Sequence, residues 1–263
     1  MITQTDSYAT FGTDSYATFG TISSPTGTLT INFPETVLDL PSNKLNIKKS
    51  YRAIRHDIIR QKQNNNDDIV HHPNEKINQI KKVLTGIDLS ILELFSGNGN
   101  CTKVYSEYGE VIAFEKKGKV FESLIENTKD CMLVHCNKAD SFLEFHKLIY
   151  LKHKYDVIDL DPYGFPNRFF PDIFLLIDKG VLFVTMPKPY VNILNGITAA
   201  HLISYYGEQN PNEQTIIERI ALWGLCHWRK VELIDSVDCK SVWRFAFSVE
   251  KVKATDYTGV KNR

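Results

Sequence analysis

A glycine-rich loop that follows directly on a short apolar run is the feature of this sequence that most constrains the fold. Residues 91–100 read Ile-Leu-Glu-Leu-Phe-Ser-Gly-Asn-Gly-Asn, which predicts a strand, a turn and then a helix over residues 101–108. Gly97 and Gly99 can take positive φ angles and let the backbone approach a ligand closely. Because open α/β sheets bind ligands at the carboxyl ends of their strands, the loop predicts a ligand site at that edge of a sheet.

The residues of the loop narrow the choice of ligand. The loop has neither the full G-x-G-x-x-G fingerprint of dinucleotide sites nor the G-K-[ST] string of triphosphate sites. An acid and an aromatic residue, Glu93 and Phe95, precede Ser96 and the G-x-G turn. This order is typical of S-adenosylmethionine sites, although a bare G-x-G also ends many ordinary strands.

Two further acids follow at the ends of expected strands. The predicted strand 110–115 ends in Glu115, a little over twenty residues after the first strand, where a carboxylate can accept both hydroxyls of a ribose. A third predicted strand, 132–135, leads to Ala139 and Asp140. Asp140 could accept the amino group of an adenine while the backbone beside it reads the ring edge. The alternative for each acid is a charge placed at a helix N-terminus, where the helix dipole favours it.

A second apolar run ends in an acid, a proline and an aromatic residue. Residues 155–164 read Tyr-Asp-Val-Ile-Asp-Leu-Asp-Pro-Tyr-Gly. Asp161 could hold an exocyclic amine by hydrogen bonds, and Tyr163 could stack on a flat base, which suits methylation of that amine. The alternative is an ordinary strand that ends in a Pro-Gly turn.

A basic segment precedes both motifs. Residues 47–62 carry six positive charges against one acid, beside an apolar stripe at helical spacing. Such a cluster can neutralise phosphates, and its alternative is a solvated helix face. The residues expected to contact nucleic acid are Lys48, Lys49, Arg52 and Arg60, with Lys188 in the loop after the predicted strand 180–186.

Composition limits the class of protein. Acidic and basic residues balance at 31 each, so nucleic-acid binding would need a local patch. The five cysteines form no C-x-x-C pair, which favours a reducing compartment and disfavours a structural zinc. The adjacent His71 and His72 lack a third ligand at a supporting spacing, and no metal site is expected. No membrane span or signal peptide is expected either, and the predicted location is cytoplasmic.

The residues quoted above resemble those of class I S-adenosylmethionine-dependent methyltransferases. The string Asp-Leu-Asp-Pro-Tyr-Gly at 159–164 is similar to the D-x-D-P-Y-G of the tRNA (guanine-N2) dimethyltransferase family. Residues 53–58 stand where that family has an A-L-N-R-D-I-like segment, with Arg55 beside His56. The resemblance covers residues 28–250 and is strongest over 91–186. It implies a Rossmann-like fold with a mostly parallel seven-stranded sheet and a C-terminal antiparallel hairpin, here at 231–237 and 242–249.

The sequence also predicts a division of the chain. Residues 1–27 form an extension in which the octapeptide at 6–13 recurs at 14–21. Residues 28–86 supply a strand at 28–33, the basic helix and a second helix at 74–84. The methyltransferase domain spans 87–250, with a helix at 212–228, and a tail covers 251–263.

The resemblance assigns roles to named residues. The cofactor would be S-adenosyl-L-methionine, bound by Glu93, Phe95, Ser96, Gly97, Gly99, Glu115, Lys116, Ala139, Asp140 and Arg55. The residues expected at the target base are Asp159, Asp161, Pro162 and Tyr163. Transfer would run directly from the sulfonium to the base nitrogen, because no Pro-Cys pair is present to attack a cytosine ring.

Three functions remain open at this point. The first is an RNA guanine-N2 methyltransferase, with tRNA as the favoured partner, and it draws on the D-P-Y-G resemblance. The second is a DNA methyltransferase acting on adenine N6 or cytosine N4, since acid-Pro-aromatic turns also serve that chemistry. The third is a nucleic-acid-binding module that retains the fold without turnover. Protein partners and oligomeric state are not predicted.

Overall fold

The computed structural model describes residues 22–24, 27–29, 72–189 and 199–253. The chain divides into two compact units, residues 1–50 and 51–263. In the first unit, β1 (Ile22–Ser24) and β2 (Gly27–Leu29) form an antiparallel hairpin in which Ile22 lies opposite Leu29. The strand expected at 28–33 therefore overlaps β2 at its first two residues.

Several predictions from the N-terminal part lie outside the described residues. They are the octapeptide repeat, the rest of the strand at 28–33, the basic helix at 47–62, and the side chains Lys48, Lys49, Arg52, Arg55 and Arg60. They stay predictions.

The described part of the second unit is built on a seven-stranded sheet with the strand order β5-β4-β3-β6-β7-β9-β8. Neighbouring strands from β5 to β7 run parallel, and β9 pairs antiparallel with both β7 and β8. The strands are β3 (Leu89–Glu93), β4 (Gly109–Glu115), β5 (Val134–Lys138), β6 (Val157–Leu160), β7 (Lys179–Pro187), β8 (Arg229–Cys239) and β9 (Val242–Lys251). The predicted Rossmann-like sheet with its C-terminal hairpin is confirmed.

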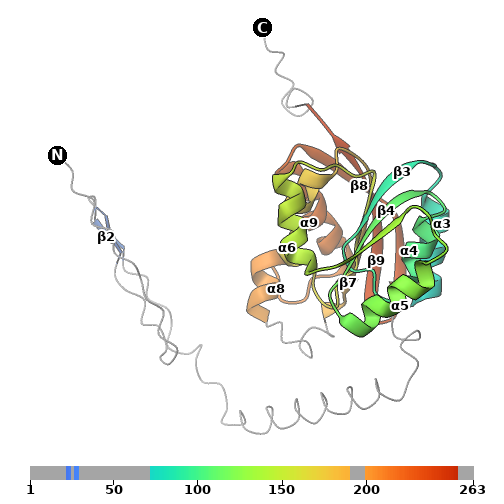
Figure 1. Ribbon diagram of the computed structural model, residues 1–263. Helices are drawn as coiled ribbons and strands as arrows, with labels where there is room; N and C mark the ends of the chain where they lie inside the picture. The colour runs from blue at the N-terminus through green and yellow to red at the C-terminus, as the bar shows by residue number, and fades with distance from the viewer. Residues whose placement is uncertain (1–21, 25–26, 30–71, 190–198, 254–263) are drawn as a thin grey trace. The chain divides into compact units, whose positions relative to one another are not determined.

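Helices cover both faces of this sheet (Figure 1). One face carries α3 (Pro73–Val83), α4 (Asn100–Tyr105) and α5 (Gly118–Thr128). The other carries α6 (Ser141–Tyr150), α8 (Ala199–Tyr206) and α9 (Glu213–Leu225). Two short 3-10 segments, η2 (Asn167–Phe169) and η3 (Asp172–Leu176), lie between β6 and β7.

Two apolar cores explain why the central strands read as unbroken apolar runs. In β3, Ile91 is buried with Ile80 of α3 and Val104 of α4, whereas the next residue, Leu92, is buried with Phe145 of α6 on the other face. Successive side chains of a strand point to opposite faces, so a strand covered on both sides needs apolar residues at every position.

Some boundaries differ from those predicted. The strand expected at 132–135 runs instead from Val134 to Lys138, because pairing with β4 begins at Val111 opposite Val134; Met132 is 96% exposed. The helix expected at 212–228 is α9, with Asn212 as its N-cap. Trp228 cannot extend that helix, because its φ is +56°. The helix expected at 101–108 begins at Asn100 and ends at Tyr105.

The register of the central strands brings the candidate site residues together. Glu93, the last residue of β3, lies opposite Ala113 of β4 on one side and Asp159 of β6 on the other. The loops that follow these three strands therefore leave the sheet at one edge. These loops carry the glycine turn, Glu115 and the Asp-Pro-Tyr-Gly turn.

Candidate active site

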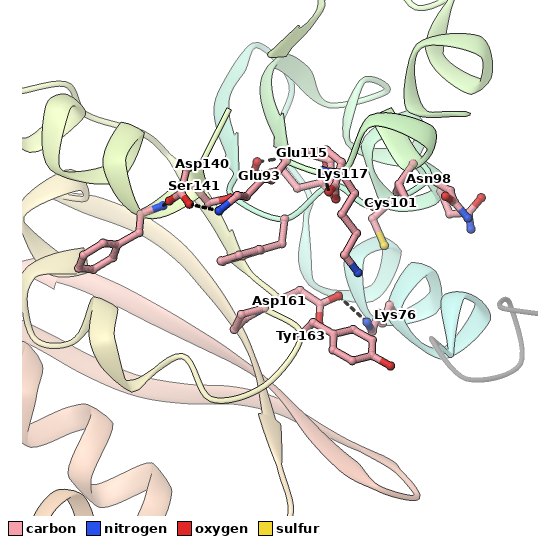
Figure 2. Close-up of a pocket in the computed structure, with 18 of the residues that line it drawn as sticks. Lys76, Glu93, Asn98, Cys101, Glu115, Lys117, Asp140, Ser141, Asp161 and Tyr163 are labelled. Carbon is pink, nitrogen blue, oxygen red and sulfur yellow. Dashed lines mark hydrogen bonds and ion pairs between the residues drawn. The ribbon is translucent and has the colours of Figure 1, made fainter. Parts of the chain in front are cut away.

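A cavity of about 620 Å³ opens at this carboxyl edge of the sheet (Figure 2). Its walls come from the loops after β3, β4, β5 and β6 and from the first turns of α3. The sequence-predicted residues that line it are Glu93, Phe95, Ser96, Gly97, Glu115, Lys116, Asp140, Asp161, Pro162 and Tyr163. The structure therefore brings most of the predicted cofactor and base residues to one place.

The glycine loop has the backbone that its sequence predicted. Gly97 and Gly99 have φ angles of +53° and +86°. Gly97 lines the cavity, and the Ser96 hydroxyl donates to the carbonyl oxygen of Glu93 at 3.3 Å. Gly99 does not line the cavity; it precedes α4, where an added Cβ would lie 2.8 Å from Cδ1 of Leu124. Because Gly99 has no side chain, the loop can pack closely on α5. Gly99 therefore has a packing role and does not contact a ligand in the cavity.

Glu93 is an unusual carboxyl group. Its side chain is almost fully buried at the floor of the cavity, and Oε2 accepts a hydrogen bond from Oγ1 of Thr102 at 2.5 Å. Burial raises the pKa of Glu93 from 4.5 to about 8, and the negative charge of Asp159 adds to the effect. A buried carboxyl that faces a cavity and holds its proton near neutral pH is well placed to ionise when a cation binds beside it.

The other two predicted cofactor acids line the same cavity. Glu115 ends β4 and accepts a hydrogen bond from the backbone N–H of Lys117 at 2.7 Å. Asp140 caps α6, where Oδ1 accepts from the backbone N–H groups of Phe142 and Leu143. Its Oδ2 accepts from Lys116 at 2.7 Å, and this hydrogen bond lowers the pKa of Asp140.

The helix-cap alternative for Asp140 is thus present in the structure, although the residue also lines the cavity. Ala139 does not line the cavity; its backbone N–H donates to the carbonyl of Glu115 at 3.2 Å. This bond links the loop after β5 to the end of β4.

The Asp-Pro-Tyr-Gly turn follows β6 directly and closes the cavity on its other side. Gly164 has a φ of +134°, and its N–H donates to the carbonyl of Pro162 at 2.8 Å. The Tyr163 ring is 64% exposed, and Nζ of Lys117 lies 5.1 Å from its centroid. Figure 2 shows Tyr163 next to the ion pair that Asp161 forms with Lys76 of α3.

The charge state of Asp161 follows from its neighbours. Burial alone would raise its pKa, but the positive charges of Lys76 and Arg244 and hydrogen bonds from Lys76 and Thr185 outweigh burial and hold the pKa below its usual value. Asp161 is therefore a carboxylate at neutral pH. It is an acceptor of hydrogen bonds and a weak base.

Asp159, predicted among the residues at the base, does not reach the cavity. Its buried carboxylate accepts two hydrogen bonds from the guanidinium of Arg244, at 3.1 and 2.7 Å, and one from Oη of Tyr105 at 2.8 Å. The Arg244 guanidinium also donates to Oγ1 of Thr185 at 3.0 Å. Asp159 thus links β6 to α4, β7 and β9 beneath the site. The prediction that it contacts the base is wrong, because its carboxylate does not line the cavity.

Lys188 is also placed away from the cavity. Its Nζ lies 2.6 and 2.7 Å from the two carboxylate oxygens of Asp238, and 5.4 Å from the ring centroid of Trp243. These contacts hold the end of β7 against the hairpin. A nucleic acid would have to displace Asp238 to use this charge.

Four site residues were not predicted. Lys76, Thr102, Tyr105 and Arg244 hold the acids of the site, from α3, α4 and β9. The sequence held one weak signal for Lys76, which stands four residues before Ile80 and so on the helix face that apolar residues bury. For the others, the pairing depends on packing between distant segments.

One wall of the cavity is aromatic. Phe95 and Phe142 each meet the ring of Phe169 edge-on, with centroids 5.6 Å apart. The guanidinium carbon of Arg168 lies 3.5 Å from the centroid of Phe142. A cavity lined by both aromatic rings and acids suits a ligand that has both a flat ring and cationic or hydroxyl groups.

Metal-binding clusters and membrane-spanning helices are both absent from the described part of the chain. Within residues 72–189 and 199–253, no cluster of three histidine, cysteine or acidic side chains could hold a metal ion. No helix among the described residues has the length and apolar character needed to cross a bilayer.

Comparison with known proteins places the fold. No protein-family model matches the sequence, and no curated protein is similar to it. Among solved structures, Trm1 from Pyrococcus horikoshii in complex with S-adenosyl-L-methionine superposes with a TM-score of 0.54 at 14% identity, over 71% of this chain and 56% of that chain.

Two further structures are similar with lower scores. Trm5b from Pyrococcus abyssi has a TM-score of 0.47 at 17% identity, over 66% of this chain and 47% of that chain. The M. jannaschii tRNA m1G37 methyltransferase has a TM-score of 0.47 at 13% identity, over 68% and 49%. The chain thus spans about half the length of these proteins. Together with the strand order, the Trm1 superposition shows that the chain has the class I methyltransferase fold.

Proposed function

We propose that this chain is an S-adenosylmethionine-dependent methyltransferase that modifies an exocyclic amine of a nucleic-acid base, and that the base is guanine, modified at N2 in tRNA or another RNA. One observation carries the proposal. The cavity of about 620 Å³ is lined both by the predicted cofactor acids Glu93, Glu115 and Asp140 and by the Asp161-Pro162-Tyr163 turn. A donor and an acceptor of a methyl group would meet there.

The residues present fit the cofactor. S-adenosylmethionine supplies a methyl group on a positively charged sulfur, and it also carries an ammonium group. Glu93 is a buried carboxyl with a pKa of about 8, so a cation bound beside it would be stabilised by its ionisation. Glu115 would accept the ribose hydroxyls, and Phe95 and Phe142 offer apolar rings to the adenine. Gly97 lets the backbone approach without a side chain.

The residues of the turn fit the target amine. The Asp161 carboxylate would accept a hydrogen bond from the amine and orient it, and Tyr163 would stack on the base. Because the pKa of Asp161 is lowered, it would mainly position the amine, and the proton that the methylated nitrogen releases would pass through its carboxylate to solvent. Such positioning can contribute about 7–11 kcal/mol to a transfer reaction.

A nucleic-acid substrate is supported by charge at the mouth. Lys117 and Arg168 line the cavity and are exposed, and their positive charges could contact phosphates that flank the base. Guanine N2 and RNA are supported by the resemblance of residues 159–164 to the guanine-N2 dimethyltransferase string. A base in a duplex would have to be flipped out to reach the cavity.

Labelled methyl transfer to tRNA, total RNA and DNA in parallel tests the proposal, with the modified nucleoside identified by mass spectrometry. N2-methylguanosine from RNA is the expected product. Asp161→Ala should abolish transfer while cofactor binding is retained, and Asp130→Ala, at an exposed position outside the cavity, should change neither.

Other outcomes select other functions. N6-methyladenine or N4-methylcytosine in DNA would indicate a DNA amino-methyltransferase. Cofactor binding without transfer to any nucleic acid would indicate a binding module. Turnover by Asp161→Ala at the wild-type rate would refute the role given to the turn.

A further inference from the structure

The ammonium of Lys76 is placed in the cavity with hydrogen-bonding capacity to spare. The Lys76 side chain is only 8% exposed, and it lines the same cavity as its ion-pair partner Asp161. An ammonium has three N–H donors. Among the described residues, Nζ donates a hydrogen bond to Oδ2 of Asp161. Leaving donors of a buried charge without acceptors is costly, so a ligand group that accepts a hydrogen bond is expected beside Lys76.

The Asp161 carboxylate beside Lys76 has acceptor positions that are not used by a hydrogen bond. A carboxylate offers about four acceptor positions, and Lys76 occupies one of them on Asp161. The cavity is therefore presented with open acceptor positions and open donors side by side. Figure 2 shows this pair facing the cavity next to Tyr163.

We propose that Lys76 and Asp161 together read the amidine edge of the target base, that is, an exocyclic amine and the ring nitrogen bonded to the same carbon. The amine would donate to Asp161, and the ring nitrogen would accept from Lys76. This inference rests on the proposed function and makes Lys76 a specificity-determining residue of the same site.

The pair limits which faces of the bases can be bound. Adenine presents N6 with N1, cytosine presents N4 with N3, and guanine presents N2 with N3. A carboxylate without a lysine would suit two neighbouring donors, such as N1–H and N2–H of guanine. Because Lys76 covers Oδ2 of Asp161, guanine would be held through N2 and N3. Uracil and thymine carry no exocyclic amine and would be rejected.

A simpler role would be that Lys76 only keeps Asp161 ionised. The two roles differ in one measurable respect. If Lys76 contacts the ring nitrogen, replacing that nitrogen by C–H must hurt the wild-type enzyme more than a variant without the lysine. If it only neutralises Asp161, the replacement affects both enzymes equally. A double-mutant cycle between protein and substrate separates them.

The experiment uses the full chain and oligonucleotides of the sequence found to be methylated. The target base is either natural or a deaza analogue that lacks the ring nitrogen beside the amine: 3-deazaguanine, 1-deazaadenine or 3-deazacytosine. The altered reactivity of the analogue amine is common to all enzymes and cancels in the cycle. Hydrogen bonds to charged groups predict a loss of about 10- to 100-fold in kcat/KM for the wild type with the analogue.

Matched variants make the comparison specific. Lys76→Met should show only the penalty that the altered reactivity of the analogue amine imposes on every enzyme, and Lys76→Gln, which retains an N–H donor, should restore part of the additional discrimination. Lys82→Met is the control on the same helix, since Lys82 pairs with Asp235 and lies outside the cavity; it should discriminate like the wild type. Cofactor affinity measured for each variant verifies folding, and Lys76→Gln serves if Lys76→Met does not fold.

Each result decides. A deaza penalty that is lost in Lys76→Met and partly kept in Lys76→Gln supports the inference. An equal penalty in the wild type and in the Lys76 variants overturns it while leaving the proposed function intact. Absence of methyl transfer by the wild type to every nucleic acid would refute the proposed function itself, and the inference with it.

Discussion

Replacing Glu93 by glutamine should change how the stability of the protein depends on pH. In the folded chain burial raises the pKa of Glu93 from 4.5 to about 8. The unfolded chain releases this proton near pH 4.5, while the folded chain holds it until about pH 8. Between these values the folded state binds one more proton than the unfolded state, so the free energy of unfolding falls as pH rises.

The size of the effect follows from the same two values. One pKa unit corresponds to about 1.36 kcal/mol, so the interval from 4.5 to about 8 costs about 5 kcal/mol of stability by pH 8. The Glu93 side chain is 3% exposed, so solvent screening reduces this figure little. Glu93→Gln keeps the shape and an oxygen acceptor for Thr102 but cannot ionise, and it should not lose this stability.

Urea unfolding of the cofactor-free full chain at intervals between pH 5 and 8.5 measures the effect. The difference in unfolding free energy between Glu93→Gln and wild type isolates this carboxyl, because the other titrating groups cancel. The variant should gain on the wild type by about 1.4 kcal/mol per pH unit, and the gain should level off near pH 8, where the folded wild type also releases the proton. Two stability curves that stay parallel over this range would refute the argument that Glu93 is buried as a neutral acid.

The remaining predictions concern binding and the buried ion pair. Cofactor affinity should strengthen from about pH 6 to pH 8 as Glu93 ionises, and Glu93→Gln should lose this dependence; calorimetry across the range measures it, and an unchanged dependence in the variant would contradict the role of the carboxyl. Tyr163→Ala should lower kcat/KM by about 10- to 100-fold through loss of base stacking, whereas Tyr150→Ala, 84% exposed and outside the cavity, should not; equal effects of the two changes would argue against stacking. Arg244→Met leaves the Asp159 carboxylate buried without its partner and should cost about 3–5 kcal/mol in urea unfolding. Adding Asp159→Leu should recover part of that loss, and a double variant less stable than Arg244→Met would contradict the pairing argument.

Local patterns predicted most of the strands and helices, because apolar runs and helix-capping residues are features of consecutive residues. Apolar runs such as 180–186 needed only to be buried on both faces to become strands, and Asn212 and Asp140 act at the starts of helices as their residue types favour. The beginning of β5 was missed because apolar character alone marked Met132, whereas pairing with β4 decides where the strand starts. Register depends on the pairing of two strands, so the sequence of one strand does not determine it.

Only the parts of the site that lie in short sequence motifs could be predicted. The glycine loop and the Asp-Pro-Tyr-Gly turn carry their chemistry in consecutive residues, and the structure places both at one cavity. The partners that set charge are remote: Lys76 and Asp161 are 85 residues apart in the chain, as are Asp159 and Arg244. Asp159 was expected at the base because it stands two residues before Asp161 in the sequence, but Arg244 and Tyr105 bind its carboxylate in the core beneath the site.

Calorimetric titration of the full chain with S-adenosylmethionine and with its demethylated thioether tests whether the cavity binds the methyl donor. We expect one site for each compound, weakened by Glu115→Ala at the cavity and unchanged by Glu110→Ala at an exposed position of β4. Absence of heat and of any other sign of uptake for both compounds, with folded wild-type protein, would contradict it.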